Sequence, residues 1–401
     1  MECDNFEIVR NIKTFKALQG DWEDLCGRSS QYRFSQSFTW CWATWEAVHK
    51  PQRFRGLQLH CVIARNGSRL VLVWPFVVYR RSAMFVATPL GLFNEYPDPL
   101  VEDGPDAVQR VQAAWSTLCN TCACDLIKFR YVHQGSALDR LRKGKKLARL
   151  VSLKKKRANL KVAWHDYSEW EDYYRSLKKK DHGDTDRRRR RLEEQGKLTF
   201  EAIEGKECTT AIDWILANKL MQLARIGRRA HVWLETKAYR NLLVWVASRG
   251  SKPLGQIVIF TLKFNDQIIA AMLCRADRTH VEVLIPVYDE AYKRYAPGKI
   301  LFIESLKWAF EHQLEFDFRG GSSPYKILLA NRKSVIIDYD VAISRSYALG
   351  LRFPVIRPLI RSYRIVRHKL GKRFRGGWLK RAVSARTMSS DMKSLPGQGY
   401  F

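Results

Sequence analysis

Two apolar hairpins, one in each half of the chain, constrain the fold more than any other feature of the sequence. The first is LQLHCVIAR and RLVLVWPFVVYRR joined through Asn66-Gly67, and the second is PLGQIVIFTLKF and QIIAAMLCRAD joined through Asn265-Asp266. Runs of β-branched and aromatic residues around a short polar pair are typical of antiparallel strands joined by a tight turn, and Asn-Gly favours type I′. Each half of the chain is therefore expected to contain an antiparallel sheet.

The predicted elements around the two hairpins follow the same order. Helices come first, the hairpin and one more strand come next, and a crossover helix leads to a returning strand. The predicted helices are 38–50, 106–119, 209–226, 236–249 and 299–313. The predicted strands beyond the hairpins are 83–88, 125–132, 198–203, 279–287 and 314–318. This order indicates an α+β fold that is built twice in tandem.

Basic residues are concentrated in three segments of the chain. There are 70 lysine and arginine residues against 40 aspartate and glutamate residues, a net charge of +30, and the excess lies in 140–161, 178–191 and the tail after 344. The expected parts of the chain are a first domain over 1–140, a basic connecting region with helices over 141–197, a second domain over 198–344, and a basic amphipathic tail, partly disordered, over 345–401.

Several classes of protein are not expected from this sequence. No run approaches the ~18 apolar residues that a membrane-spanning helix needs, and the N-terminus MECDNFEIVRNIK lacks the pattern of a secretory signal. The cysteines of CNTCAC lack the second pair of ligands that a zinc site needs, so no metal is predicted. We therefore expect a cytoplasmic protein.

The net charge favours an anionic partner, and the tail indicates which one. LGLRFPVIRPLIRSYRIVRHKLGKRFRGGWLKRA interleaves apolar and basic residues, the composition of a helix that lies on anionic lipid. This favours a peripheral location on the inner face of the cell membrane. RNA is the alternative partner, although the sequence contains no RNA-recognition signature.

The segment 287–326 carries the most informative pattern. In it, Arg294-Tyr-Ala-Pro-Gly-Lys299 places Pro297 and Gly298 directly before an amphipathic helix. The N-terminus of a helix carries roughly half a positive charge and free N–H groups, so Arg294, Pro297, Gly298 and Lys299 are candidates to bind a pyrophosphate. The competing interpretation is an ordinary turn before a helix.

The residues of this segment resemble the acetyltransferase (GNAT) superfamily, and more closely its tandem-domain branch related to FemAB-type aminoacyltransferases and cellulose-biosynthesis acetyltransferases. The resemblance covers about 20–345. The matching residues are Tyr288, Tyr292, Ala296, Pro297, Gly298, Leu301, Asp317, Phe318, Gly321, Tyr325 and Lys326. The chain departs from the usual GNAT loop, because Pro297-Gly298 stands where Gly-x-Gly is expected.

The resemblance implies two tandem GNAT-like domains and a one-step acyl transfer. The co-substrate would be acyl-CoA, most simply acetyl-CoA, and the acceptor an amine or hydroxyl of a small molecule, glycan or lipid-linked precursor in cell-envelope or exopolysaccharide synthesis. Backbone N–H groups near Leu284 to Val287 would hold the developing oxyanion. The alternative that the resemblance leaves open is a FemAB-like aminoacyltransferase that uses aminoacyl-tRNA.

The candidate site residues all have structural alternatives. The candidate catalytic residues are Glu282 as a base, Tyr288 and Tyr295 as acids, and Asp317 to orient the base or the acceptor. The candidate substrate-binding residues are Asn94, Tyr96 and Asp98 in the loop GLFNEYPDPLVE, His231, Tyr325 and Lys326. The alternatives are buried packing for the tyrosines, a turn cap for Asp317, and solvated surface for Glu282 and Lys326.

Overall fold

The structure, a computed structural model, describes only part of the chain. The described residues are 4–49, 56–81, 84–91, 96–144, 151–227, 234–250 and 254–343. The predicted basic tail and the candidate substrate residues Asn94 and His231 lie outside the described residues.

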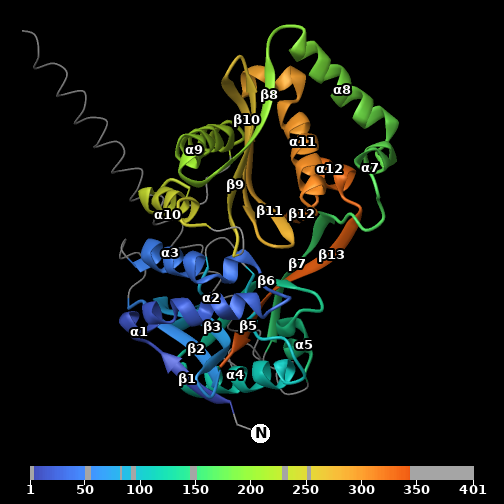
Figure 1. Cartoon of the computed structure of the whole chain (residues 1–401). Coiled ribbons are helices and arrows are strands. Elements are labelled where there is room, and N and C mark those ends of the chain that lie inside the picture. The colour runs from blue at the N-terminus through green and yellow to red at the C-terminus, as the bar shows by residue number, and fades with distance from the viewer. Residues whose placement is uncertain are drawn as a thin grey trace, which may run out of the picture. The chain divides into compact units, whose positions relative to one another are not determined.

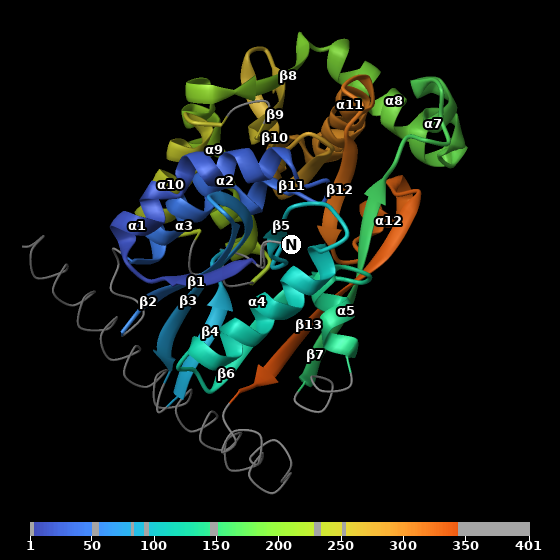
Figure 2. The same ribbon diagram turned by 60° about the horizontal axis from the view of Figure 1, so that its bottom comes forward.

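The N-terminal half places helices on both faces of an antiparallel meander (Figure 2). Its elements are β1 (Asn5–Val9), α1 (Ile12–Ala17), α2 (Gln19–Gly27), η1 (Phe34–Gln36), α3 (Phe38–His49), β2 (Gln58–Asn66), β3 (Arg69–Arg81), β4 (Met84–Pro89), β5 (Leu100–Val101), α4 (Ala107–Thr121), β6 (Leu126–His133) and α5 (Ala137–Lys143). The α1–α3 helices bury large aromatic side chains, Phe15, Trp22 and Trp40 among them, against the sheet. Burial of this apolar surface is what stabilises such short helices.

The C-terminal half repeats the arrangement. Its elements are β7 (Val151–Val162), α7 (Trp170–Ser176), α8 (Lys179–Glu193), β8 (Leu198–Glu204), η2 (Gly205–Glu207), α9 (Cys208–Arg225), α10 (Lys237–Ala247), β9 (Gln256–Phe264), β10 (Gln267–Ala276), β11 (His280–Tyr288), η3 (Glu290–Tyr295), α11 (Pro297–Glu311), β12 (Glu315–Gly320), α12 (Pro324–Leu329) and β13 (Arg332–Ala342). Figure 1 shows α9 and α10 on one side of the strands β8–β11 and α11 on the other. The predicted α+β fold built twice is therefore confirmed.

One continuous sheet joins the two halves. Its strand order is β1-β2-β3-β4-β6-β13-β7-β12-β11-β10-β9-β8. β6 pairs with β13 rather than with β7, the next strand along the chain, and β12 pairs with β7. The strand β13, from the C-terminal half, therefore lies beside β6 of the N-terminal half, and β7 lies between β13 and β12 (Figure 1).

The strand β7 corrects one interpretation of the basic charge. Within the region expected to contain helices, the run Lys154 to Arg157 forms part of a strand, whereas α7 and α8 are helical as expected. The strand β13 supplies acids beside the run: Arg157 lies 2.5 Å from Asp338, and Lys154 lies 3.7 Å from Asp340. Cross-strand pairs of opposite charge favour the strand pairing.

The two hairpin turns differ from each other. Asn265 and Asp266 both have positive φ, at 47° and 62°, as a type I′ turn requires. The expected type I′ turn at Asn66-Gly67 is wrong, because Asn66 pairs with Arg69 and leaves Gly67 and Ser68 as the turn residues. Gly67 has a φ of 56°, and Ser68 is not left-handed, which fits type II′ instead.

Parallel strand pairs that separate after a few residues occur once in each half. β11 and β12 pair only from His280–Glu315 to Glu282–Asp317, and β4 and β6 pair at Val86 and Ala87. In the N-terminal half, the aromatic rings of Trp74, Phe76, Trp115 and Phe129 pack against one another, with Trp74 stacked on Phe129 and the other pairs tilted or edge-on. No helix in the described part of the chain is long and apolar enough to cross a membrane.

Candidate functional site

A polar cavity of about 300 Å³ lies where the two halves of the sheet meet. Its residues come from the loop before η1, the loop after β4, the strands β6, β7, β11, β12 and β13, and the turn before β11. They are Gln31, Arg33, Tyr96, Tyr131, His133, Gln134, Gly135, Ser136, Asn159, Lys161, Asp277, His280, Glu282, Asp317 and Ser334. Three predicted site residues, Tyr96, Glu282 and Asp317, are thus brought together.

Glu282 is held between two arginines. Its carboxylate pairs with the buried Arg275 and lies 3.0 Å from Nε of Arg319. Burial alone would raise the pKa of Glu282, but the two guanidinium groups outweigh it and lower that pKa to about 2. A carboxylate that remains ionised so strongly is a weak base, so the geometry favours a structural and electrostatic role for Glu282 over proton abstraction.

Asp317 sits beside Glu282 on the next strand and is oriented from two sides. Nδ2 of Asn159 donates to both carboxylate oxygens, at 3.1 and 3.2 Å, and the backbone N–H of Arg319 donates to one of them at 2.6 Å. Asp317 therefore caps the following turn, as its structural alternative predicted, and also lines the cavity. The carboxylate remains an acceptor that faces any molecule in the cavity.

His133, which the sequence did not single out, lies in the same cavity at the end of β6. Its ring lies 5.2 Å from that of Tyr96 and 6.1 Å from that of Tyr131. Burial lowers the pKa of His133, and the carboxylates of Asp317 and Glu282 oppose this only in part. A neutral imidazole in a polar cavity is a suitable proton acceptor near neutral pH.

Two left-handed residues face each other at the rim of the site. Tyr131 has a φ of 66° and Arg319 a φ of 61°, and the guanidinium of Arg319 lies 4.8 Å from the Tyr131 ring. The Tyr131 hydroxyl also accepts a hydrogen bond from the backbone N–H of Gly320. Residues other than glycine seldom adopt the left-handed backbone conformation, and those that do cluster at functional sites.

The strand β11 carries a β-bulge at Leu284. Leu273 of β10 pairs with Ile285, while the next residue, Cys274, pairs with Val283. The bulge leaves the backbone of Leu284 out of the ladder, within the stretch predicted to hold an oxyanion. It lies two residues beyond Glu282, where β11 and β12 have separated.

The predicted pyrophosphate site forms the N-terminus of α11. Ala296 is left-handed, with a φ of 51°, and Pro297 is the first residue of the helix. A Cβ at Gly298 would lie 3.4 Å from the ring of Tyr288, so a methyl group would just touch this ring and a much larger side chain would have to displace it. Arg188 of α8 donates to the carbonyl of Arg294, which brings the arginine-rich helix next to this end of α11.

The tyrosines predicted as acids lie at this end rather than at the cavity. The Tyr295 hydroxyl donates to Gln195 at 2.8 Å and accepts from Arg294 at 2.7 Å. Tyr288 is the last residue of β11, four residues beyond the bulge, and burial followed by Glu290 raises its pKa. Neither tyrosine lines the polar cavity.

The remaining predicted substrate residues have structural contacts. Oδ1 of Asp98 accepts from the N–H of Leu138 at 2.8 Å, and burial raises the pKa of Asp98 to about 6. Tyr325 stacks on Phe302 at 4.7 Å. Nζ of Lys326 donates to the Phe318 carbonyl at 2.7 Å and to the next two carbonyls at 3.4 and 3.3 Å, and burial lowers its pKa to about 8.

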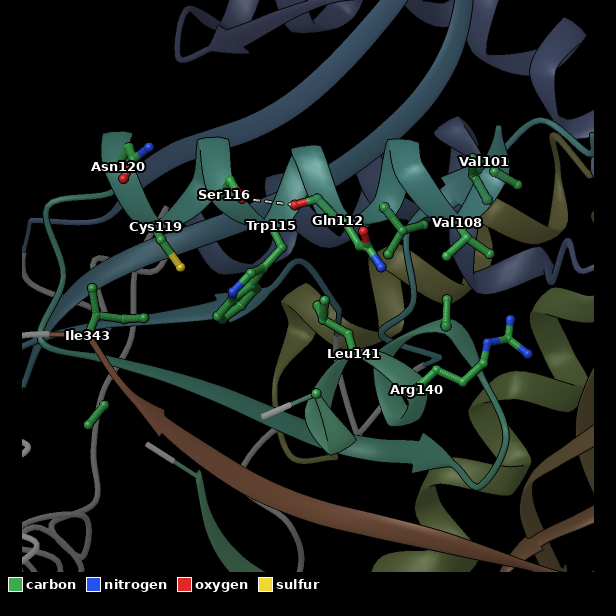
Figure 3. A pocket seen from close by; sticks show the side chains of 15 residues that line it. Val101, Val108, Gln112, Trp115, Ser116, Cys119, Asn120, Arg140, Leu141 and Ile343 are labelled. Carbon is green, nitrogen blue, oxygen red and sulfur yellow. Dashed lines mark hydrogen bonds between the residues drawn. The ribbon is translucent and has the colours of Figure 1, made fainter. Parts of the chain in front are cut away.

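A second cavity, of about 750 Å³, lies between α4 and α5 (Figure 3). Val108, Trp115, Leu141 and Ile343 give it a mainly apolar lining, with Arg140 at one end. Gln112, Ser116, Cys119 and Asn120 of α4 also line it, but its described lining contains no histidine or carboxylate that could accept a proton from an acceptor. The polar cavity, next to the separated strands, is therefore the candidate active site.

Comparison with known proteins agrees with the fold. Residues 179–327 match the family described as an acetyltransferase (GNAT) domain, and the comparison with curated protein sequences gives no match. The structure of FemX is similar with a TM-score of 0.59 and 11% identity, over 86% of this chain and 99% of FemX. A conserved protein of unknown function from Bacteroides thetaiotaomicron is similar with a TM-score of 0.51 and 11% identity, over 84% of this chain and all of that chain.

Likenesses at this identity show the fold alone, whereas the family match concerns the sequence of the C-terminal half. That match contains the separated strands, the bulge, the Pro-Gly turn and the crossover helix α11. Residues 179–327 therefore match the acetyltransferase (GNAT) domain family, in a chain whose fold resembles that of FemX.

Proposed function

We propose that this acyltransferase moves an acetyl or other acyl group from acyl-CoA to an amine or hydroxyl of a cell-envelope or exopolysaccharide precursor. The observation that carries the proposal is the separation of β11 and β12 beyond Glu282 and Asp317, with the bulge at Leu284 beside it. The separation leaves the backbone of β11 beyond Glu282 without a neighbouring strand on that side, where an extended ligand can pair with it, and the polar cavity adjoins this stretch.

The two ends of acyl-CoA have matching features in this arrangement. The N-terminus of α11 suits the pyrophosphate, since Gly298 allows close approach and the helix dipole favours negative charge. The free backbone N–H at the bulge suits the thioester oxygen, which becomes negative as the acceptor attacks. Arg188 and Lys299 add positive charge near the pyrophosphate end.

The proposed transfer has one step, with the acceptor nucleophile in the polar cavity. His133 takes the proton that the nucleophile loses, and Glu282 stays ionised and fixes the two arginines beside it. The carbon–sulfur bond breaks as the new bond to the acceptor forms. Tyr288 stays the predicted proton donor to the thiolate, since Tyr295 donates its hydrogen to Gln195.

Calorimetric titration with acetyl-CoA tests the proposal. We expect saturable binding at roughly 1 µM to 1 mM, which Gly298→Trp abolishes because the indole must displace Tyr288 and cover the helix N-terminus. Gly20→Trp is the matched control, because the position of its Cβ is open. Absence of acetyl-CoA binding, together with tight and salt-dependent binding of tRNA, would favour the aminoacyl-tRNA alternative.

A further inference from the structure

The side-chain oxygen of Asn159, Oδ1, is a buried acceptor that has no donor among the described residues. Asn159 is 1% exposed and lines the polar cavity from β7, and its Oδ1 accepts no hydrogen bond. Its orientation is fixed, because Nδ2 donates to both oxygens of Asp317 and a flipped amide would place oxygen against oxygen. Oδ1 therefore points away from Asp317.

An unpaired buried carbonyl of this kind indicates a missing donor. More than nine in ten buried polar groups in proteins are hydrogen-bonded, and two of the charged groups that line the same cavity are already paired. Glu282 is bound by two arginines, and Lys161 lies 2.5 Å from Glu315. The donor that Asn159 lacks would then come from the molecule that enters the cavity.

The geometry points to Asn159 as the residue that selects an amine rather than a hydroxyl as the acceptor, an inference that rests on the proposed acyl transfer. A neutral primary amine carries two hydrogens. One proton passes to His133 as nitrogen bonds to the thioester carbon and the thiolate leaves to be protonated. The second hydrogen remains on nitrogen and donates to Oδ1 of Asn159 through the step.

A hydroxyl cannot satisfy both groups. Its single hydrogen is the one that His133 must remove, so Oδ1 of Asn159 would stay buried and unpaired in the transition state. Leaving a buried acceptor unpaired corresponds to a rate penalty of roughly tenfold to a hundredfold. Asn159 would thus be a specificity-determining residue contributed by β7, the strand that lies between β13 and β12.

The test compares paired acceptors of the same skeleton, glucosamine against glucose and lysine against 6-hydroxynorleucine, with acetyl-CoA as donor. The wild-type protein should prefer each amine. Asn159→Leu should lower kcat/KM for the amines roughly tenfold to a hundredfold more than for the matching alcohols, and so remove the preference for the amine. Asn331→Leu is the matched control, because the side chain of Asn331 hydrogen-bonds the backbone N–H and carbonyl of Ala163 and does not line the cavity.

The outcomes separate this inference from the proposed function. Absence of acetyl-CoA binding would overturn both. Turnover in which Asn159→Leu lowers amine and alcohol rates equally would overturn the inference alone, and would assign Asn159 to holding Asp317 or a water molecule. Equal amine and alcohol rates in the wild-type protein would overturn it as well, even if the variant failed to fold.

Discussion

Replacement of Glu282 by glutamine distinguishes a structural carboxylate from a catalytic base. The neutral amide leaves Arg275, which is buried under the ring of Trp40 at 4.6 Å, without its counter-charge, and it turns an N–H₂ group toward one of the two guanidinium groups. Breaking a buried ion pair from one side costs about 3–5 kcal/mol. The lowering of the pKa from 4.5 to about 2 gives about 3 kcal/mol by an independent route.

The pH dependence of this effect has a definite sign. A carboxylate whose pKa is lower in the folded state stabilises the fold above its unfolded pKa, and this contribution is lost as the pH falls through the folded value. Urea unfolding followed by tryptophan fluorescence should therefore show a loss of about 3 kcal/mol for Glu282→Gln from pH 8 to 5, and a shrinking loss below pH 4.5.

A second glutamate provides the control for Glu282→Gln, and one outcome would refute the structural role of Glu282. Glu201→Gln removes an exposed pair with Lys263 and should cost less than about 1 kcal/mol. A Glu282→Gln variant with unchanged stability, whose kcat falls by 10²–10⁴ and whose rate no longer depends on pH, would show that Glu282 is the base after all.

Three further predictions concern single residues. His133→Gln should lower kcat roughly 10²–10⁴-fold and remove the rise of the rate with pH. In the wild-type protein this rise should occur at a pKa below the usual 6.5, because burial disfavours the imidazolium. An unchanged pH–rate profile of the variant would count against this role of His133. Asp98→Asn should raise the free energy of unfolding by up to about 3 kcal/mol at pH 8 and should not change it below pH 3.8. The reason is that the folded pKa of about 6 makes ionisation of Asp98 costly in the folded state as the pH rises from 3.8 to 6. Equal stability of the variant and the wild-type protein in urea at both pH values would contradict this. Lys326→Met should lower the stability by about 1–3 kcal/mol, because three carbonyls lose their shared donor, and an unchanged Tm would refute it.

The repeated order of elements was predictable because hydrophobic periodicity is a local property. The hairpins and the crossover helices each carry their own pattern of apolar residues, whatever the rest of the chain does. The strands β7 and β13 were not assigned, since they pair with each other across a long stretch of sequence and β13 also pairs with β6 of the N-terminal half. Lys154 to Arg157 look like a solvated run until Asp338 and Asp340 are placed beside them.

The candidate site, too, was predictable from the sequence only in part. Asp317 was found because it belongs to the segment 287–326, which resembles a known family, and Glu282 because it lies in the predicted strand before that segment; the parallel pairing of β11 and β12 makes them neighbours. Asn159 and His133 come from β7 and β6, and they meet at the cavity because both strands pair with β13. One available signal for His133 was its position at the carboxyl end of a strand in a sheet with crossover helices.

Acceptor-dependent turnover in a cavity-filling variant tests most directly whether the acceptor binds in the polar cavity. Ser334 lines the cavity from β13, and Lys333, its neighbour, is exposed on the other face of that strand. We predict that Ser334→Trp binds acetyl-CoA as the wild-type protein does but releases no CoA thiol when acceptor is added, while Lys333→Trp turns over normally. Undiminished turnover by Ser334→Trp would contradict the assignment of the cavity.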